Sequence, residues 1–200
     1  TLQDSSAASD VYKRQVYEPQ LREVCSTVED EFGYAEVPVV AFADLYAGKI
    51  CAALDRQHPR DLFDIKWLLE NEGLNDEIRK ALLVYLSSHN RPIAELLRPQ
   101  FKDISAIYAG EFASMTETEV PLEELITVRE RLVDMIHQAL TDTEKQFLLS
   151  VKSLNPDWTL LKLNGADKLP AIKWKQINLA KMPDEKHAQA LEKLTQVLGI

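Results

Sequence analysis

Residues 45–56 read LYAGKICAALDR and residues 58–64 read HPRDLFD, and these two adjacent segments decide how the chain folds. Apolar residues recur in both at helical spacing, with Pro59 at the break, so we predict two helices joined by a tight turn. The segments also hold three cations and two carboxylates: Lys49, Arg56, Arg60, Asp61 and Asp64. Charges set among apolar residues are costly unless they are paired or used. We therefore look for a functional site in this hairpin.

The first helix divides into two sides when residues 42–56 are placed at about 100° per residue. One side, which we predict to face solvent, carries Asp44, Gly48, Cys51 and Asp55. The opposite side carries Lys49 and Arg56 among the apolar residues Phe42, Leu45, Ala52 and Ala53. A lysine in that position either extends its ammonium past small neighbours into water or serves a site. Helical geometry alone leaves both interpretations open.

The second helix repeats this pattern. In residues 60–71, the predicted solvent face carries Lys66 and Glu70, and the predicted core stripe carries Leu62, Ile65 and Leu69. Asp61 and Asp64 fall inside the apolar arc. Taken singly, Asp61 suits the first turn of a helix, and Arg60 can pair with Asp64 four residues later. Taken together, the five charges predict a pocket that binds phosphate and offers a carboxylate to accept a proton.

The composition is that of an ordinary globular chain of 200 residues, 46% hydrophobic and 28% charged. No apolar run approaches the roughly 18 residues that span a bilayer, and no signal peptide is visible, so we expect no membrane association and a cytoplasmic location. Cys25 and Cys51 have no zinc-site or disulfide-framework spacing, and the four histidines have no metal-ligand spacing. The net charge of −9 disfavours a surface that binds nucleic acid throughout.

The N-terminal part of the chain differs from the rest. Residues 1–15 have neither helical nor strand periodicity and resemble a translated adapter sequence, so we expect a disordered, non-native leader. Residues 16–41 contain one predicted strand, 34–41, which Pro38 restricts to the edge of a sheet. Because one strand cannot form a sheet alone, we expect its partners to lie in sequence upstream of this chain.

From Phe42 onward we predict helices only, so the fold class is mainly α. We divide this part into a helical domain, residues 42–139, and a lysine-containing helical region, residues 140–200. The predicted helix starts are Asn75, Pro121, Thr141 with Glu144 as a capping box, Pro170 and Pro183, and Gly199 ends the last helix.

The C-terminal region also holds Trp158 and Trp174, the latter flanked by Lys173 and Lys175. Lysine with interleaved aromatic residues is typical of RNA contacts, in which an aromatic ring stacks on a base. A buried tryptophan beside a solvated lysine face explains the same pattern, and we favour it because tryptophan is mostly buried.

The run from Leu45 through Lys49 and Arg56 to RDLFD at residues 60–64 resembles the K…R…RDxxD segment of AbiEii/AbiGii-type nucleotidyltransferases. These are toxins of bacterial toxin–antitoxin and abortive-infection systems. The resemblance continues more weakly over residues 16–200. It implies a polymerase-beta-like nucleotidyltransferase that transfers a nucleoside monophosphate from an NTP to an acceptor, for relatives RNA and notably tRNA ends.

The resemblance also implies roles for the hairpin charges. Lys49, Arg56 and Arg60 would bind the nucleotide, and Asp61 or Asp64 would act as the catalytic base for the acceptor hydroxyl. It implies NTP and magnesium as cofactors and a cognate antitoxin as a partner. Residues 16–41 would then be a remnant of the nucleotidyltransferase core.

One departure from the family pattern limits these expectations. The Gly-Ser turn and the Asp-x-Asp pair that binds magnesium do not occur anywhere in the sequence. Two-metal catalysis requires such carboxylates. We therefore expect this chain to be the C-terminal part of the enzyme and to be inactive alone. The alternative, from a different class, is a helical interaction module in which the hairpin charges form a buried structural network.

Overall fold

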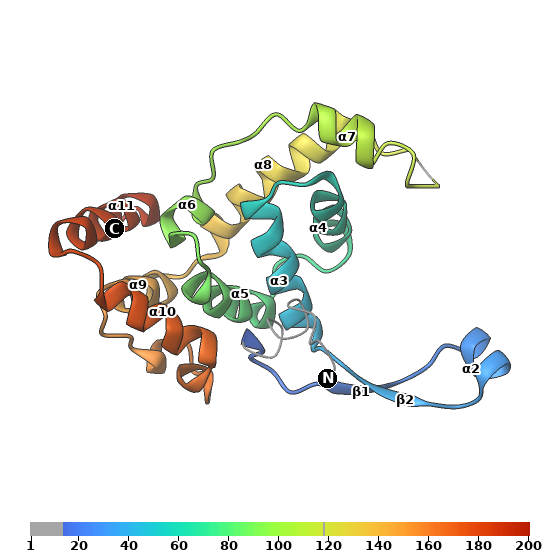
Figure 1. Cartoon of the computed structure of the whole chain (residues 1–200), viewed down its shortest axis with the longest axis horizontal. Helices are drawn as coiled ribbons and strands as arrows, with labels where there is room; N and C mark the ends of the chain where they lie inside the picture. Colours follow the sequence, from blue (N-terminus) through green and yellow to red (C-terminus); the bar gives the residue numbers. More distant parts are fainter. Residues whose placement is uncertain (1–13, 118) are drawn as a thin grey trace.

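The computed structural model describes residues 14–117 and 119–200, which form ten α-helices, two short 3-10 helices and one two-stranded sheet (Figure 1). This confirms the predicted mainly α fold. The elements are β1 Gln20–Glu23, α2 Ser26–Phe32, β2 Glu36–Val39, α3 Phe42–Asp55, α4 Pro59–Asn71, α5 Asp76–Ser88, α6 Ile93–Leu97, α7 Ser105–Glu111, α8 Leu122–Ala139, α9 Asp142–Lys152, η1 Trp158–Leu160, η2 Ala166–Lys168, α10 Pro170–Ala180 and α11 Asp184–Leu198. Of the expected leader, residues 1–13 lie outside the described residues.

β1, α2 and β2 form an arm that projects from the helices, with α2 at its tip (Figure 1). β2 lies within the predicted strand, and it pairs antiparallel with β1, with Leu21 opposite Pro38. The expectation that its strand partner lies outside the chain was therefore wrong. No residue of β1, α2 or β2 is buried. A lone two-stranded hairpin is only marginally stable in water, and no buried residue of the arm supports this one.

The helical body is built around α3, which packs against α4 and α5, while α4 also packs against α8. Small residues make the close approach of α3 possible, with Ala47 and Ala53 fully buried. On α4, the predicted core stripe of Leu62, Ile65 and Leu69 is buried as expected. α3 and α4 thus form a rigid hairpin that holds the charged segment in place.

The predicted helix boundaries are largely those observed. Asn75 Oδ1 accepts a hydrogen bond from the Ile78 amide at 3.0 Å and caps α5. Thr141 and Glu144 form the predicted capping box of α9. Gly199 adopts a left-handed conformation with φ of 68° and ends α11. Pro170 is the first residue of α10, whereas Pro121 and Pro183 each lie one residue before their helix begins.

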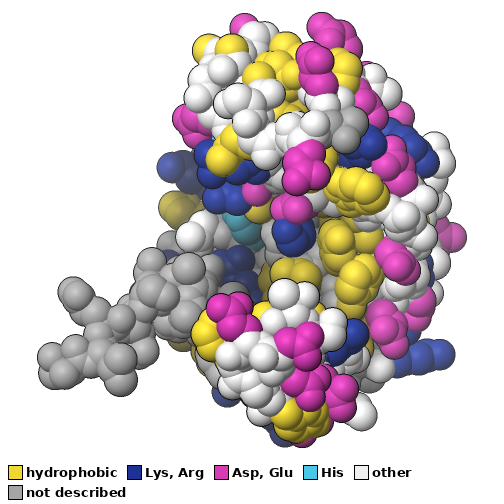
Figure 2. All heavy atoms as spheres, turned by 90° about the vertical axis from the view of Figure 1, so that its right-hand side faces the viewer, with side chains coloured by type: hydrophobic (Ala, Val, Ile, Leu, Met, Phe, Trp, Pro, Cys, Tyr) yellow, Lys and Arg dark blue, Asp and Glu magenta, His cyan; other side chains and the backbone are white. Residues whose placement is uncertain are grey.

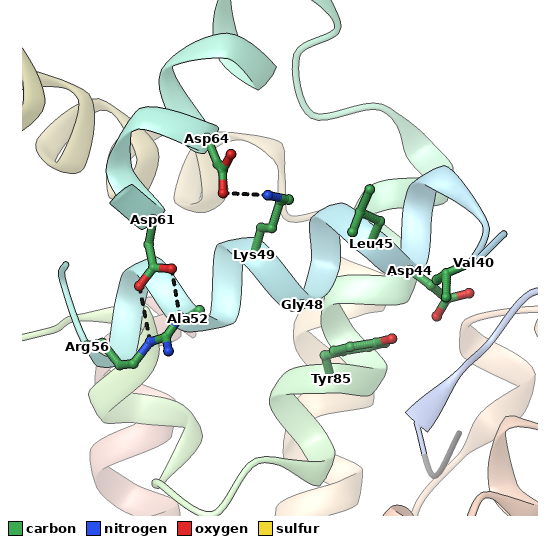
Figure 3. Close-up of a pocket in the computed structure, with 10 residues that line it drawn as sticks. All are labelled: Val40, Asp44, Leu45, Gly48, Lys49, Ala52, Arg56, Asp61, Asp64 and Tyr85. Carbon is green, nitrogen blue, oxygen red and sulfur yellow. Dashed lines mark hydrogen bonds and ion pairs between the residues drawn. The ribbon is translucent and has the colours of Figure 1, made fainter. Parts of the chain in front are cut away.

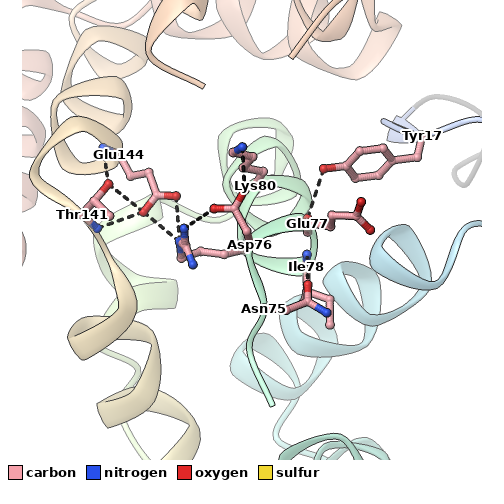
Figure 4. Close-up of polar contacts among 9 residues, drawn as sticks. Tyr17, Asn75, Asp76, Glu77, Ile78, Lys80, Thr141 and Glu144 are labelled. Atoms are coloured by element: carbon pink, nitrogen blue, oxygen red, sulfur yellow. Dashed lines mark hydrogen bonds and ion pairs between the residues drawn. The ribbon is translucent and has the colours of Figure 1, made fainter. Parts of the chain in front are cut away.

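Glu144 also carries the main polar link between α5 and α9 (Figure 4). Its carboxylate accepts two hydrogen bonds from Arg79 Nε, at 2.7 and 3.0 Å, and one from the Thr141 amide at 2.9 Å. The side chain of Glu144 is 5% exposed and that of Arg79 is 16% exposed. Arg79 in turn reaches Asp76, which also pairs with Lys80. A charge in this position is stable because its partners satisfy both carboxylate oxygens.

The prediction of a buried Trp174 was wrong, and the predicted solvated lysine face holds for Lys173 but not for Lys175. Trp174 is 62% exposed, and Ile177 on the same helix is 50% exposed. Lys175 instead turns inward, and its ammonium donates hydrogen bonds to the carbonyl oxygens of His89 and Asn90 at 2.6 and 3.3 Å. These carbonyls follow the C-terminal end of α5, where a cation is favourable. Trp174 is next to Lys175 in sequence and therefore points about 100° away, toward solvent.

The inward position of Lys175 predicts a pH dependence of folding stability. Burial lowers the pKa of Lys175 from 10.5 to about 8, with further lowering by the charges of Lys152 and Arg14. Between these two pH values the unfolded chain binds more protons than the folded chain, so the free energy of unfolding contributed by this group rises with pH. We expect urea unfolding at pH 7 and pH 9.5 to show this gain in the wild type and not in Lys175→Met. Equal pH dependence in the two proteins would contradict it.

Candidate functional site

A pocket of about 360 Å³ opens over α3, between α4 and α5 (Figure 3). Its walls bring together four of the five charges singled out in the sequence, Lys49, Arg56, Asp61 and Asp64. The remaining lining residues are Val40, Asp44, Leu45, Gly48, Ala52 and Tyr85. The four charges form two ion pairs, each joining α3 to α4 (Figure 3).

Arg56 and Asp61 form a two-pronged ion pair at one end of the pocket. Arg56 Nε and Nη2 donate to the two carboxylate oxygens of Asp61 at 3.1 and 2.7 Å. The Asp61 side chain is 13% exposed, whereas that of Arg56 is 64% exposed. Such paired geometry fixes both groups, which leaves the outer surface of the guanidinium available to an anion. Asp61 thus acts as a positioning group for Arg56.

Lys49 and Asp64 form the second pair, in the middle of the pocket. Lys49 Nζ donates to Asp64 Oδ2, and the two side chains are 31% and 40% exposed. Both groups are therefore open to solvent and to a ligand. Asp64 is thus the more exposed of the two aspartates, at 40% against 13% for Asp61, and the role of either as a base remains a prediction.

Arg60 does not line the pocket. Its guanidinium lies near Glu111 at the end of α7, 3.4 Å from the carbonyl oxygen and 3.9 Å from the carboxylate. His58 joins the same cluster, 3.2 Å from the Glu111 carboxylate, and its Nδ1 accepts from the Arg60 amide as the cap of α4. The possible Arg60–Asp64 pair is thus replaced by contacts across helices. The nucleotide-binding role given to Arg60 remains a prediction, for a side chain that lies outside the pocket of the other four charges.

The predicted orientation of α3 was wrong. Asp44 and Cys51, placed on the solvent face, are 1% and 3% exposed, while Phe42 and Leu45 are 38% and 43% exposed. The buried face tolerates Asp44 because its two carboxylate oxygens accept the amides of Val16 and Tyr17, each at 2.8 Å. Burial nevertheless raises the pKa of Asp44, and these hydrogen bonds oppose the rise.

Tyr85 and Gly48 are among the pocket residues that were not recognised from the sequence as part of a site. Tyr85 is buried on α5 beneath α3, and burial together with Asp44 raises the pKa of its phenol. Gly48 lies at the centre of the pocket, between Lys49 and Tyr85 (Figure 3). A glycine inside a helix is the signal that could have marked this position, since it weakens the helix.

The residues present do not fit a metal ion. In the part of the chain that the structure describes, no group of three histidine, cysteine, aspartate or glutamate side chains is arranged to hold one. Of the three pocket carboxylates, Asp61 and Asp64 are each paired with a cation, and Asp44 accepts the amides of Val16 and Tyr17. The magnesium implied by the sequence resemblance thus has no site among these side chains.

Comparison with protein families identifies the chain's relatives. The family model described as "Nucleotidyl transferase AbiEii toxin, Type IV TA system" matches residues 10–178. The chain belongs to the AbiEii family. The AbiEii match covers the arm, the charged hairpin and the helices through most of α10. No curated protein and no solved structure matches the chain.

Membership of the AbiEii family confirms the resemblance drawn from the hairpin motif. AbiEii proteins are nucleotidyl transferase toxins of type IV toxin–antitoxin systems, so an antitoxin partner belongs to the system. Among the described residues, no helix has the length and apolar character needed to cross a membrane.

Proposed function

We propose that the pocket over α3 binds the phosphates of a nucleoside triphosphate and forms one half of a nucleotidyl-transfer site. The observation that carries this proposal is the meeting of Lys49, Arg56, Asp61 and Asp64 in one pocket of an AbiEii family chain. Lysine and arginine are the usual ligands of phosphate, arginine through two parallel hydrogen bonds.

Each charge then has a distinct role. Lys49, released from Asp64 by the competing anion, binds the phosphate chain, and Arg56 binds it from the end where Asp61 holds the guanidinium in place. Asp64 Oδ1 takes the proton of the acceptor hydroxyl as its oxygen attacks the α-phosphorus, and pyrophosphate leaves. Positioning and charge stabilisation supply most of the catalysis in phosphoryl transfer.

The metal-binding carboxylates, in this proposal, come from polypeptide outside these 200 residues. The surface that would receive it runs from the arm onto α3, where large hydrophobic side chains are exposed: Leu21, Val28, Phe32, Tyr34, Val37, Val39, Phe42 and Leu45. Figure 2, which views the molecule from the arm's end, shows hydrophobic side chains gathered between protruding parts of this face. Exposed apolar area of this extent, beside open strand edges, is typical of an interaction surface.

The acceptor and the setting follow from the family as part of the same proposal. We infer that the acceptor is RNA, with tRNA ends as the first candidate, and that the complete enzyme works in the cytoplasm with NTP and magnesium. Arg60, which lies outside the pocket, is a candidate for contacts with this acceptor.

A second candidate function has one observation in its favour. Lys49, Arg56, Asp61 and Asp64 are paired with each other, and both pairs join α3 to α4. A helical interaction module that uses these pairs only for structure would have the same contacts. The two functions predict different effects of removing these ion pairs. A structural network must contribute to folding, so its loss lowers the stability of an interaction module, whereas only the nucleotidyl-transfer site binds nucleotide.

The proposed roles of the two aspartates predict different outcomes for their asparagine variants. In the complete enzyme, Asp64→Asn should lower transfer of labelled nucleotide to RNA by about 100-fold or more while NTP affinity is retained, because a general base is lost. Asp61→Asn should instead lower NTP affinity, because Arg56 loses its two-pronged partner. Gel assays with magnesium and each NTP measure the transfer of labelled nucleotide to RNA. Titration of each variant with NTP measures the affinity. Full activity of Asp64→Asn would refute its role as base.

A further inference from the structure

Gly48 occupies a position where no contact among the described residues requires glycine. It lies in the interior of α3, and its backbone is not in the left-handed region that favours glycine. Among residues 14–117 and 119–200, a Cβ built at Gly48 would meet only Tyr85 Cε1 within 4 Å, at 3.5 Å, which is ordinary van der Waals contact. Alanine would therefore fit, and it would stabilise the helix. The chain keeps the less stable residue.

The surroundings of Gly48 indicate what the missing side chain leaves room for. Gly48 lies between Lys49, beside the two ion pairs, and the ring of Tyr85 (Figure 3). Leu45 and Ala52 line the pocket beside it, and the Asp44 carboxylate lies at the Tyr85 hydroxyl. Glycine within a regular element often marks the close approach of a ligand to the backbone.

We propose that the nucleoside part of the bound NTP lies against the α3 backbone at Gly48, so that Gly48 determines which ligands fit. This inference rests on the proposed function, because it assumes that the phosphates lie at Lys49 and Arg56. The ribose and base then extend over Gly48 toward the Leu45 side chain and the Tyr85 ring, away from the two ion pairs. A side chain at position 48 would occupy the space of the nucleoside and leave the phosphate end of the pocket unchanged.

The test compares two kinds of ligand and three variants of the 200-residue chain. The ligands are the four NTPs, each titrated separately, and inorganic tripolyphosphate, which has the phosphates without the nucleoside. The variants are Gly48→Ala, Gly48→Leu and the matched control Gly110→Ala. Gly110 is also helical, in α7, with no atom of the described part of the chain within 4 Å of the place that a Cβ would take, and it does not line the pocket.

The expected result is a loss of NTP affinity of about 10-fold for Gly48→Ala and about 100-fold for Gly48→Leu, the range that one crowded contact produces. Tripolyphosphate affinity should stay within about 2-fold in both. Gly48→Ala and Gly110→Ala should each raise the melting temperature by about 1–3 °C, since alanine favours helix over glycine. Gly110→Ala should leave both affinities unchanged.

Three results would overturn the inference. If NTP affinity is unchanged in both Gly48 variants, the nucleoside does not lie at Gly48. The same follows if the wild-type chain binds NTP no more tightly than tripolyphosphate. Equal loss of tripolyphosphate affinity would place the phosphates, not the nucleoside, at Gly48. If the wild-type chain binds neither ligand, the proposed function fails as well, which distinguishes that failure from the failure of this inference alone.

Discussion

Replacing Lys49 by alanine is expected to weaken NTP binding to this chain by about 10- to 100-fold. The substitution removes one hydrogen bond between a charged donor and a charged acceptor, which contributes about 1.5–3 kcal/mol. It also leaves Asp64 without its cation, so that the pocket becomes more negative toward the phosphates. In the complete enzyme, the same change should reduce transfer by about 100-fold or more, because phosphate charge is stabilised most in the transition state.

The fold should tolerate this substitution, which separates the two candidate functions. Lys49 and Asp64 are 31% and 40% exposed, and ion pairs at such exposure contribute about 0–1 kcal/mol. We expect the midpoint of thermal unfolding of Lys49→Ala to fall by less than about 4 °C. The matched control is Lys66→Ala, which removes a paired lysine of α4 that lies outside this pocket. Unchanged NTP affinity together with a large loss of stability would support the interaction module instead.

Replacing Glu144 by alanine is expected to lower the free energy of unfolding by about 3–5 kcal/mol. Removing one partner of a buried ion pair is strongly destabilising, and here Arg79, 16% exposed, would keep only Asp76, which is 60% exposed. The same substitution also removes the capping box of α9, because Glu144 Oε2 accepts from the amide and hydroxyl of Thr141. The two losses act on the same contact between α5 and α9.

Urea unfolding measures this effect, with Glu130→Ala as its control. Glu130 is an exposed glutamate of α8, and its removal should change stability by no more than about 0.5 kcal/mol. Glu144→Gln keeps the shape of the side chain and should lose less than Glu144→Ala. A loss below about 1 kcal/mol in Glu144→Ala would show that water replaces the carboxylate and that the network is not a main support of the fold.

Local signals in the sequence predicted the helices and the hairpin well. Asn75, Thr141 and Gly199 act through hydrogen bonds or backbone conformations that depend only on neighbouring residues, so their roles can be read from the sequence. The meeting of Lys49 with Asp64 follows from the same cause, since a tight turn forces α3 and α4 to lie side by side.

The orientation of α3 could not be predicted in this way. Apolar residues occur all around this helix, so periodicity does not decide which side is buried. The buried side includes Asp44, whose carboxylate is satisfied by the amides of Val16 and Tyr17, 28 and 27 residues earlier in the chain. Such a contact depends on the tertiary structure and leaves no local signal.

Arg60 and Trp174 were misplaced for a related reason. Arg60 is directed by Glu111, which lies 51 residues away on α7. Trp174 is exposed because Lys175, its neighbour, reaches the end of α5. In both cases a long side chain, that of Arg60 or Lys175, binds a group at the end of another helix. The direction of that side chain depends on this distant partner, which local sequence does not indicate.

Binding of nucleoside triphosphates over α3 is the central claim, and amide NMR spectra of the ¹⁵N-labelled chain during NTP titration test it most directly. We predict saturable shifts at the amides of Gly48, Lys49 and Arg56, with Gly110 unmoved and the shifts lost in Lys49→Ala. Saturable shifts confined to other helices, or none at millimolar NTP, would contradict it.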